Sequence, residues 1–564
     1  MSARFSFIAR AAVAGAALAL AGCQGGGSQA LPSGDPALVA TDKGPVRGTV
    51  SGSLRLFQAI PYAAPPVGAN RFAPPQPAAS WGTTIKDATK AGTVCPQSGP
   101  PAAPFGLDQE TSDDCLTLNV TAPIAGGGLP VMVWIHGGAF TQGAGSFYPA
   151  QALASHGIVV VTINYRLGIL GFLANPAFDP SGKGQTGDFG IEDQIAALQW
   201  VRTNAGAFGG NPANVTIAGE SAGSLSVCDL VANAAAGGAA HGLFVRGIAE
   251  SGACEVPNAT LASAESSANA LSAQLGCSGS GAAVVACLRG LSVKKILGVQ
   301  ATLTLGGTAP NVGGPDIPQQ PKSAIGSYPM LLGGNKYEWG LFIALGLPPP
   351  PTNQASYNST LQSVYGSTVG TLVQNAPQYA YANFAGNPVY PQPFLALQTV
   401  MTDFALSDPV AFCYDVVTWN KQAATANPIF AYEFADMNAP TTLPFAPFNS
   451  LVPPGPLHAA ELQYLFPGIA SPPQAGAPAN GQGPALPASE VPLSNEMIAY
   501  WTNFVATGNP NGSGLPTWPS YKTPADALVF SGPAANQTAT GNVDAEHYCS
   551  AFWVPIYAPF GVLN

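Results

Sequence analysis

Two continuous apolar runs stand out along the chain, at residues 131–135 and 158–163. Apolar runs of this length without polar alternation predict strands that are buried on both faces, as in a parallel sheet. Residues 215–218 predict a third buried strand, and residues 330–332 form a shorter apolar run. We therefore expect buried strands of one largely parallel sheet at these four places.

Helical periodicity lies between and after these runs. Apolar residues recur at the spacing of one helix face from Ile191 to Val201, which predicts a helix there. A second helical stretch begins after residue 223 and reaches Leu230. Strands that alternate with helices indicate an α/β sheet with helices on both faces.

Length and composition narrow the possible architectures. The chain has 564 residues, beyond the roughly 250 to 300 at which a single core usually stops growing. We therefore expect several domains or one large α/β domain, and a small scaffold held only by disulfides is excluded. Apolar residues make up 47% and charged residues only 9%, while 66 Gly and 55 Pro indicate a loop-rich but globular chain. The Pro-rich stretches expected to form loops lie at 347–352, 440–456 and 467–488.

Charge excludes one class of partner. The net charge is -10, and Lys and Arg nowhere form a run, so nothing in the chain would neutralise a phosphate backbone. Nucleic acid is therefore not expected as a partner. The five histidines are scattered and no Cys-x-x-Cys pair occurs, so we expect neither a metal site nor a thioredoxin-type motif.

The first residues have the layout of an export signal. Two arginines precede an apolar stretch too short to span a membrane, and small residues lead to Cys23. Small residues before a cysteine resemble a bacterial lipobox, in which the cysteine thiol is lipidated and becomes the first mature residue. We expect a lipoprotein signal peptide over 1–22, a flexible Gly-rich tether over 23–36 and one catalytic domain over 37–564.

This layout predicts where the protein resides. The expected location is outside the cytoplasm, with the protein anchored by lipid and facing the periplasm or the cell exterior. The alternative is an ordinary cleavage site and a soluble secreted protein. Removing residues 1–22 removes two Arg and no acid, so a basic membrane-binding patch is not expected and attachment would depend on lipid.

Two Gly-rich segments carry candidate chemistry. GESAG at 219–223 follows an expected buried strand and precedes a helix, the context of a nucleophile elbow that exposes a strained serine. HGGAF at 136–140 follows another expected strand, where such folds place the backbone N–H groups that stabilise an oxyanion. The alternatives are an ordinary Gly-rich turn and a turn capped by His136. Together, in this order, the two segments favour acyl transfer.

A serine nucleophile needs a base and an orienting acid, which follow it in the order serine, acid, histidine. Only His458 and His547 leave room for an acid after the serine. His458 follows a Pro-rich loop, which suits a position above the sheet, whereas His547 lies beside a cysteine near the C-terminus. Glu338 comes just past the strand expected at 330–332, where α/β sites are built. The competing acids are Asp316, Asp403 and Asp408.

Four segments, HGGAF, GESAG, GGNKYEWG and LHAAELQYLF, resemble the active-site segments of the type-B carboxylesterase family. This family of α/β-hydrolases includes cholinesterases, mammalian carboxylesterases and bacterial p-nitrobenzyl esterases. The resemblance runs nearly end to end and in the same order. It implies a large, mostly parallel central sheet flanked by helices, with long loop and helical insertions around the active site. It also implies a serine ester hydrolase that needs no cofactor and takes a small-molecule ester.

The resemblance assigns a role to each candidate of the triad. Ser221 is implied as the nucleophile, His458 as the general base and then acid, and Glu338 as the group that holds the imidazole. An acyl-enzyme would form on the serine and be hydrolysed by water.

Further residues are implied around the triad. The oxyanion N–H groups fall at Gly138, Ala139 and Ala222. Ala139 stands where the family commonly has a third glycine, so it keeps the N–H but narrows the site by a methyl group. Glu220 and Ser251 match positions that support the triad.

The nine cysteines leave eight for disulfides if Cys23 is lipidated, an even number in an oxidising compartment. Cys228 and Cys254 have no counterpart in the family pattern. One lies on the expected elbow helix and the other follows residues 250–252, so we expect a disulfide between them. The resemblance implies the pairs Cys95–Cys115, Cys277–Cys287 and Cys413–Cys549, and the structural ion pairs Arg71–Asp113 and Arg166–Asp193.

We expect hydrolysis of small to medium apolar or aromatic esters, with a lipase acting on longer acyl chains as the alternative. Phe140, Phe445 and Phe448 are candidates for an apolar entrance, and the small residues at 305–310 suggest room for a bulky acyl group. Cholinesterase activity is disfavoured because the segment around Phe105 contains no Trp to face a quaternary ammonium. A non-catalytic binding role is disfavoured because the chain keeps all three triad residues.

Overall fold

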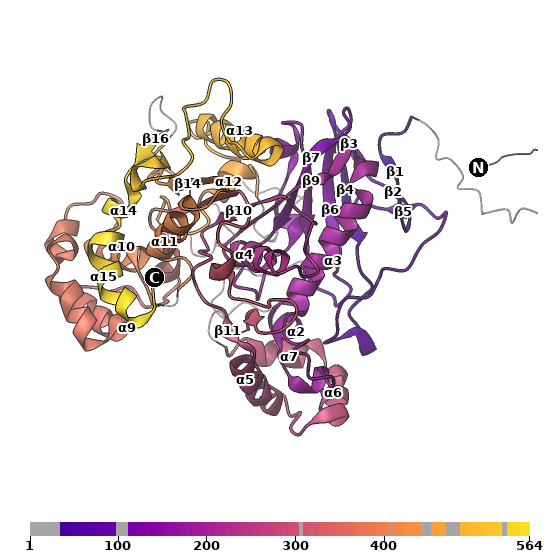
Figure 1. Ribbon diagram of the computed structural model, residues 1–564, viewed down its shortest axis with the longest axis horizontal. Helices are drawn as coiled ribbons and strands as arrows, with labels where there is room; N and C mark the ends of the chain where they lie inside the picture. Colours follow the sequence, from indigo (N-terminus) through magenta and orange to yellow (C-terminus); the bar gives the residue numbers. More distant parts are fainter. Residues whose placement is uncertain are drawn as a thin grey trace, which may run out of the picture. The chain divides into compact units, whose positions relative to one another are not determined.

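The computed structural model describes most of the chain after residue 33. The described residues are 34–97, 111–303, 308–406, 408–440, 453–469, 485–532 and 538–563. Residues Pro36–Asn564 form one compact unit (Figure 1). Cys23, the expected signal peptide and nearly all of the expected tether lie outside the described residues. In the part that is described, no helix combines the length and apolar character needed to cross a membrane.

One large sheet organises the described chain. Its strands are arranged in the order β16-β15-β14-β13-β10-β9-β7-β8-β6-β4-β3. From β8 to β15 neighbouring strands are parallel, and the pairs at both ends of the sheet are antiparallel. The strands are β3 (Thr49–Ser51), β4 (Leu54–Pro61), β6 (Thr117–Pro123), β7 (Leu129–Ile135), β8 (Val159–Ile163), β9 (Gly210–Glu220), β10 (Arg246–Glu250), β13 (Met330–Asn335), β14 (Ile429–Phe434), β15 (Ala527–Phe530) and β16 (Thr538–Gly541).

Two smaller sheets accompany the large one. The first has the order β1-β2-β5, and the second consists of β11 and β12, which pair in parallel. Their strands are β1 (Leu38–Thr41), β2 (Gly44–Arg47), β5 (Lys86–Asp87), β11 (Ala259–Thr260) and β12 (Asn311–Val312).

The expected strands and helices are confirmed. The four apolar runs lie in the strands β7, β8, β9 and β13, and the two expected helices are α3 and α4. The helices are α1 (Gln151–Ala154), α2 (Gly168–Phe172), α3 (Phe189–Asn204), α4 (Ala222–Ala235), α5 (Leu261–Gln274), α6 (Gly281–Gly290), α7 (Val293–Gln300), α8 (Trp339–Ala344), α9 (Gln354–Asn375), α10 (Gln392–Asp403), α11 (Phe412–Ala423), α12 (Leu462–Leu465), α13 (Val491–Thr507), α14 (Val543–Glu546) and α15 (Val554–Tyr557).

The central sheet is covered on both faces, as the continuous apolar runs require. Val131, Val133 and Ile135 of β7 belong to a core shared with α3, α4 and α11. Met132 and Trp134 of the same strand belong to a second core shared with α1, α12 and α13. Successive side chains of a strand point to opposite faces, so a strand with both faces buried must be apolar throughout.

Helical insertions extend the unit beyond the sheet. Helices α5, α6 and α7 lie together below the sheet in Figure 1 and share a third core that includes Leu271, Leu288 and Ile296. Helices α9, α10 and α15 lie together at the end of the unit opposite β3 and β4 (Figure 1). These insertions are the helical additions that the family resemblance implied.

Four disulfides are present among the described cysteines. They join the four pairs expected from the sequence, including the pair without a family counterpart. The bonds are Cys95–Cys115, Cys228–Cys254, Cys277–Cys287 and Cys413–Cys549.

Candidate active site

Strand register brings the candidate residues to one edge of the sheet. Gly219 of β9 lies opposite Ile135 of β7, and Glu220 lies opposite Glu250 of β10. Glu250 in turn lies opposite Gly333 of β13. The carboxyl ends of four neighbouring parallel strands therefore end side by side, which is where α/β sheets place their sites.

Ser221 occupies the sharp turn between β9 and α4. Its backbone has φ 57° and ψ -122°, a strained conformation for a residue with a side chain. The turn is held because the Ser221 N–H donates to the carbonyl oxygen of Glu250 at 2.8 Å. Only glycine fits at position 223, since a Cβ there would overlap the carbonyl oxygen of Ile135.

His458 lies between Ser221 and Glu338. Its Nε2 is 3.0 Å from the Ser221 Oγ, and its Nδ1 is 2.6 Å from the Glu338 Oε2. An isolated parallel bridge pairs Tyr337 with Leu457, the residues just before the acid and the histidine. This bridge explains how two segments 120 residues apart in sequence place their side chains in contact.

The second oxygen of Glu338 is also held. Oε1 accepts hydrogen bonds from the backbone N–H and the side-chain amide of Asn335, at 2.5 Å and 3.4 Å. Glu338 and His458 are both buried. The carboxylate is thus fixed on one side by the turn after β13 and on the other by the imidazole.

The loop after β7 lies beside the serine, since Ala139 and Phe140 line one cavity together with Ser221. Gly138, Ala139 and Phe140 all have positive φ, at 107°, 53° and 59°. Ala222 is the first residue of α4, so its N–H has no acceptor within the helix. The methyl group of Ala139 is accommodated in the left-handed conformation that glycine would adopt more easily.

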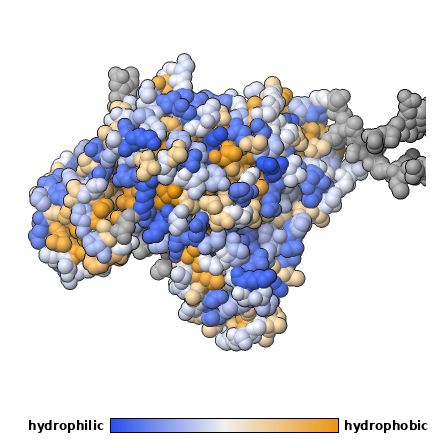
Figure 2. Space-filling view, in the orientation of Figure 1, coloured by the Kyte–Doolittle hydropathy of each residue, from blue (hydrophilic) through white to orange (hydrophobic). Residues whose placement is uncertain are grey.

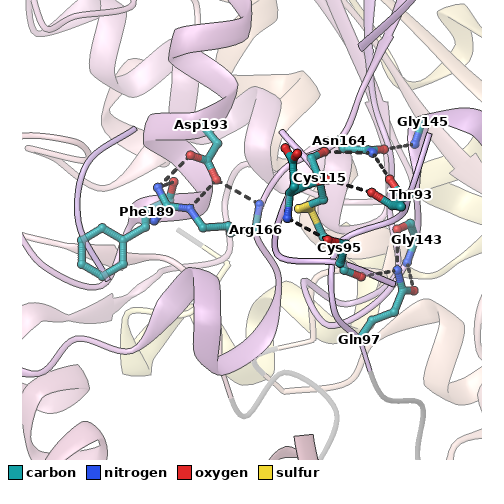
Figure 3. Close-up of a disulfide and its surroundings, with 12 residues drawn as sticks. Thr93, Cys95, Gln97, Cys115, Gly143, Gly145, Asn164, Arg166, Phe189 and Asp193 are labelled. Atoms are coloured by element: carbon teal, nitrogen blue, oxygen red, sulfur yellow. Dashed lines mark hydrogen bonds and ion pairs between the residues drawn. A yellow bond between two sulfur atoms is a disulfide. The ribbon is translucent and has the colours of Figure 1, made fainter. Parts of the chain in front are cut away.

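The same loop is tied to a disulfide. Gln97, two residues after Cys95, accepts from the N–H of Gly143 at 2.8 Å and donates to its carbonyl oxygen at 3.1 Å (Figure 3). Asn164 accepts from the N–H of Gly145 at 2.9 Å and donates to the carbonyl oxygen of Cys115 at 3.1 Å. The Cys95–Cys115 bond and these two side chains therefore fix the far end of the Gly-rich loop.

The two expected structural ion pairs are present. Arg166 and Asp193 are joined by two hydrogen bonds of 2.7 Å and are buried beside the disulfide region (Figure 3). Arg71 Nη2 lies 2.5 Å from Asp113 Oδ2.

His136, the first residue of the Gly-rich loop, stacks on a tyrosine ring, and burial lowers its pKa to about 4. Its ring is therefore neutral and packs as a structural element.

Glu220 adds a second carboxylate to the imidazole. Its Oε1 lies 3.2 Å from the Nε2 of His458, the same nitrogen that faces Ser221. Burial alone would lower the pKa of His458, but the carboxylates of Glu220 and Glu338 outweigh it and raise the pKa to about 9. Burial raises the pKa of Glu220 to about 8. The imidazolium form is thus strongly stabilised in this site.

A buried polar cluster behind the histidine includes residues that the sequence analysis did not single out. Ser251 donates to Glu461 Oε1 at 3.3 Å, and the Asn335 amide donates to Glu461 Oε2 at 2.6 Å and to Ser251 at 3.1 Å. Burial raises the pKa of Glu461 to about 7. No local sequence pattern marks Asn335 or Glu461, because the contact that joins them is between segments 126 residues apart in the chain.

A cavity of about 770 Å³ opens beside Ser221. Phe140 and Ala139 of the Gly-rich loop line it, as expected of the apolar entrance, together with Trp339, Phe342 and other mostly apolar residues. Residues 308–310 of the small-residue segment also line it. Phe105, Phe445, Phe448 and residues 305–307 lie outside the described residues.

The alternative histidine and acids stand outside the contacts that join Ser221, His458 and Glu338. His547 is held between Asp403, at 2.6 Å, and Glu433, at 2.7 Å, and does not contact Ser221. Burial would lower the pKa of His547, but hydrogen bonds to these carboxylates raise it to about 10. Asp408 lines the cavity, and Asp316 lies next to Glu192. Within the described chain, no group of three or more acidic, Cys or His side chains is arranged to hold a metal ion.

Comparison with known proteins identifies the family. A profile of the Carboxylesterase family matches residues 35–550. The chain is 33% identical to human cocaine esterase over 84% of this chain and 83% of that protein. It is 32% identical to rat carboxylesterase 1D over 96% of both.

Among solved structures, a PNB esterase matches with a TM-score of 0.69 at 29% identity, over 91% of this chain and 100% of that one. A Geobacillus stearothermophilus carboxylesterase matches with a TM-score of 0.70 at 29% identity, over 91% and 99%. The chain therefore belongs to the carboxylesterase family and is a carboxylic ester hydrolase with the α/β-hydrolase fold.

Proposed function

We propose that Ser221, His458 and Glu338 form the catalytic triad of this esterase. His458 takes the Ser221 proton as the hydroxyl oxygen attacks the ester carbonyl, while Glu338 orients the imidazole and stabilises the imidazolium. The imidazolium then gives its proton to the leaving alcohol, and an acyl-enzyme remains on Ser221. Water, activated by the same histidine, hydrolyses the acyl-enzyme and regenerates the serine.

The negative charge on the carbonyl oxygen needs donors in fixed positions. We assign them to the backbone N–H groups of Gly138, Ala139 and Ala222, which come from the loop after β7 and the first turn of α4. Removal of one donor of this kind commonly costs a hundredfold or more in rate. Glu220 and Ser251 support the triad through contacts with His458 and Glu461.

The observation that carries the proposal is the continuous contact from Ser221 Oγ through His458 to Glu338, at 3.0 Å and 2.6 Å. Ser221→Ala removes the nucleophile, so kcat should fall by roughly a millionfold. The measurement is p-nitrophenyl ester hydrolysis by purified protein, with Ser266→Ala, an exposed serine on α5 outside the cavity lining, as the control. If Ser221→Ala keeps substantial activity while folding normally, the assignment of the nucleophile is wrong.

For the substrate, we propose small to medium apolar or aromatic esters. The cavity beside Ser221 is lined mostly by apolar side chains, which favours apolar acyl or alcohol groups. A panel of p-nitrophenyl esters from acetate to palmitate tests the length preference. A maximum of kcat/KM at short or medium chains supports the proposal, and a maximum at palmitate would show that the protein is a lipase.

The names of similar proteins point the same way. One relative from Anas platyrhynchos, 31% identical over 86% of both chains, is a medium-chain fatty acyl-CoA hydrolase precursor. A mouse relative, 32% identical over 84% of this chain, is an acylcarnitine hydrolase. Acyl groups of medium length would fit the proposed preference.

We also propose that the protein is exported and anchored by lipid at Cys23, with residues 37–564 as its single catalytic domain. The support is the lipobox-like sequence that ends in Cys23 and the Gly-rich segment after it. Four disulfides fit an oxidising compartment.

A further inference from the structure

A carboxylate stands in the wall of the cavity beside Ser221. Among the described residues that line this cavity, Asp408 is the one with a charged side chain, and most of the others are apolar. Asp408 is partly exposed, whereas its neighbour Val410 is buried. The charge of Asp408 therefore lies where a ligand in the cavity can meet it.

One oxygen of this carboxylate is free to accept a hydrogen bond. Oδ1 accepts from the Val410 N–H at 3.0 Å, in a turn that an asparagine side chain forms equally well. Oδ2 has no hydrogen-bond partner within the described protein. Unlike the unpartnered Oδ2 of Asp229, it is not buried. The turn thus accounts for one oxygen of Asp408 and leaves the other oxygen and the charge without a partner.

No cation of the described protein neutralises this charge. Asp408 forms no ion pair with a described Lys, Arg or His. Burial raises the pKa of Asp408 to about 6, while the positive charge of His458 lowers it and the negative charge of Glu338 raises it. The carboxyl group is therefore ionised at pH 7.5. An ionised carboxylate that has lost part of its water without gaining a cation is unfavourable, so a cation beside it would be stabilised.

The turn that carries Asp408 is joined to the segment behind the nucleophile. The carbonyl oxygen of Pro409 accepts from the Ala253 N–H at 2.9 Å. The preceding residue, Gly252, accepts from the Ser224 hydroxyl of the elbow helix α4 at 2.7 Å. Both contacts hold the turn close to the elbow, so one ligand can occupy the cavity at Ser221 and extend to Asp408.

Two aromatic rings in the same wall favour the same kind of ligand. Trp339 and Phe342 of α8 line the cavity, are partly exposed and have ring centroids 5.4 Å apart. The face of an aromatic ring attracts a cation, and its apolar surface accepts alkyl groups. An anionic group, by contrast, meets no Lys or Arg among the described lining residues and faces the charge of Asp408.

We propose that Asp408 is a specificity-determining residue that selects esters carrying a protonated amine, whose N–H donates to the Asp408 carboxylate while the ester carbonyl lies at Ser221. The inference rests on the proposed function, because it takes the cavity beside Ser221 as the substrate site. A hydrogen bond between two charged groups is roughly twice as strong as a neutral one. An uncharged analogue would leave the carboxylate without a partner, which is the basis of discrimination.

Matched sets of three esters test this selection at pH 7.5. The members of a set have the same length and end in a dimethylammonium group, its uncharged carbon isostere or a trimethylammonium group. One series carries this end on the alcohol part of butyrate esters, and the other carries it on the acyl part of ethyl esters, each at several chain lengths. Titration of the released acid gives kcat/KM. At the matching length, we expect kcat/KM to be about tenfold higher for the dimethylammonium ester than for its isostere.

The trimethylammonium ester separates the hydrogen bond from the charge in the unmodified enzyme. It keeps the positive charge but has no N–H to donate. Its kcat/KM should therefore lie between those of the dimethylammonium ester and the uncharged isostere. This comparison needs no variant of Asp408, so it holds even if a substitution impairs folding.

Asp408→Asn connects the preference to the carboxylate. Asparagine keeps the shape and the acceptor for the Val410 N–H but removes the charge, so the ratio of dimethylammonium to isostere kcat/KM should fall to about one. Glu265→Gln removes a negative charge from α5 outside the cavity lining. It is the matched control and should leave the ratio unchanged. Because each enzyme is compared with itself, a general loss of activity does not affect the ratio.

Three outcomes would overturn the proposal. The first is that the unmodified enzyme shows no preference for the dimethylammonium ester at any length in either series. The second is a preference that persists in Asp408→Asn. The third is a trimethylammonium ester that is hydrolysed at least as efficiently as the dimethylammonium ester, which would assign the selection to the aromatic rings. A failure of the triad is distinct from these, because Ser221→Ala should abolish hydrolysis of all three esters alike without selecting among them.

Discussion

The protonation of His458 is the residue-scale property that most directly controls the proposed chemistry. The imidazole must be neutral to take the Ser221 proton, yet Glu220 and Glu338 hold its pKa at about 9 against the effect of burial. Activity should therefore rise with pH, reach half of its maximum near pH 9 and level off about one pH unit higher. Because Glu220 itself titrates near pH 8, the rising limb belongs to the coupled pair and not to one residue.

Glu220→Gln should move this limb to lower pH. Glutamine has nearly the same shape but no charge, so one of the two carboxylates that raise the pKa of His458 is lost while Glu338 remains. We expect the apparent pKa in the kcat/KM profile to fall by about one pH unit. The measurement is initial-rate hydrolysis of one ester between pH 5 and 10, corrected for spontaneous hydrolysis.

Glu461→Gln is the matched control for this shift. Glu461 also raises the pKa of His458, but its effect is the smallest of the charges acting on the imidazole. Its removal should therefore shift the profile less than Glu220→Gln does. An unchanged profile in Glu220→Gln, or a larger shift in Glu461→Gln, would contradict the assigned electrostatics.

At the same scale, the sequence predicts some site residues better than others. Ser221, Glu338 and His458 could be found because each stands at a recognisable place, a Gly-flanked turn, a strand end and a Pro-rich loop, in a fixed order. Glu461 and Asn335 could not. Their importance comes from the hydrogen bonds that they share with each other and with Ser251 across the fold, and no local pattern records such contacts.

At the scale of elements, four central strands, β7, β8, β9 and β13, were predictable because burial on both faces leaves a continuous apolar run. The central strands β10 and β14 were not predicted. The outer strands were not predicted. In β4, for example, partly exposed positions separate the buried ones, and its register with β6 shifts between Phe57 and Ile60. The pairing of β11 with β12 involves two residues from each strand. Such short contacts depend on the surrounding fold and have no periodic signal.

The Cys228–Cys254 disulfide joins the elbow helix to the end of β10 close to the nucleophile. Cys228 lies on α4 two turns after Ser221, and Cys254 follows the turn at Ser251. The same two segments are joined by the Ser224 hydroxyl, which donates to the carbonyl oxygen of Gly252 at 2.7 Å. The bond therefore reinforces the contact that holds the strained turn at Ser221.

Removing this disulfide should affect catalysis as well as stability. Its loop spans 26 residues, so the Cys228→Ala, Cys254→Ala double variant should lose about 3 kcal/mol of stability. We also expect kcat to fall roughly tenfold at a temperature where the variant is folded, because the elbow is less tightly positioned. Thermal unfolding and steady-state kinetics on the same preparations measure both effects.

A second double variant provides the comparison. Cys277→Ala, Cys287→Ala removes a bond at the α5–α6 junction, with a loop of 10 residues and no contact with the elbow. It should lower thermal stability without a comparable fall in kcat. Equal losses of kcat in both double variants would mean that the elbow disulfide acts only through general stability.

At the scale of the whole molecule, low charge distinguishes this chain from an ordinary soluble domain. Charged residues make up 9%, and Figure 2 shows hydrophobic and hydrophilic residues intermingled over the visible face. The net charge of -10 disfavours binding to an anionic lipid surface through electrostatics. Any stable attachment to a membrane would then depend on a hydrophobic anchor, which is the role proposed for lipid on Cys23.

Cys23→Ser should release the enzyme from the membrane. Serine cannot carry the thioether-linked lipid, so activity should move from the membrane fraction to the soluble exported fraction, with the same kcat per molecule. The residues from 23 to 36 would span at most about 50 Å when extended, which keeps a lipidated enzyme near the surface. Fractionation of cells, with ester hydrolysis and immunoblotting in each fraction, measures the shift.

Ser28→Ala in the same segment is the control and should leave the distribution unchanged. The thioether anchor is wrong if the unmodified enzyme is already soluble, or if the Cys23→Ser variant stays with the membrane. A soluble unmodified enzyme outside the cell would support ordinary cleavage of the signal peptide.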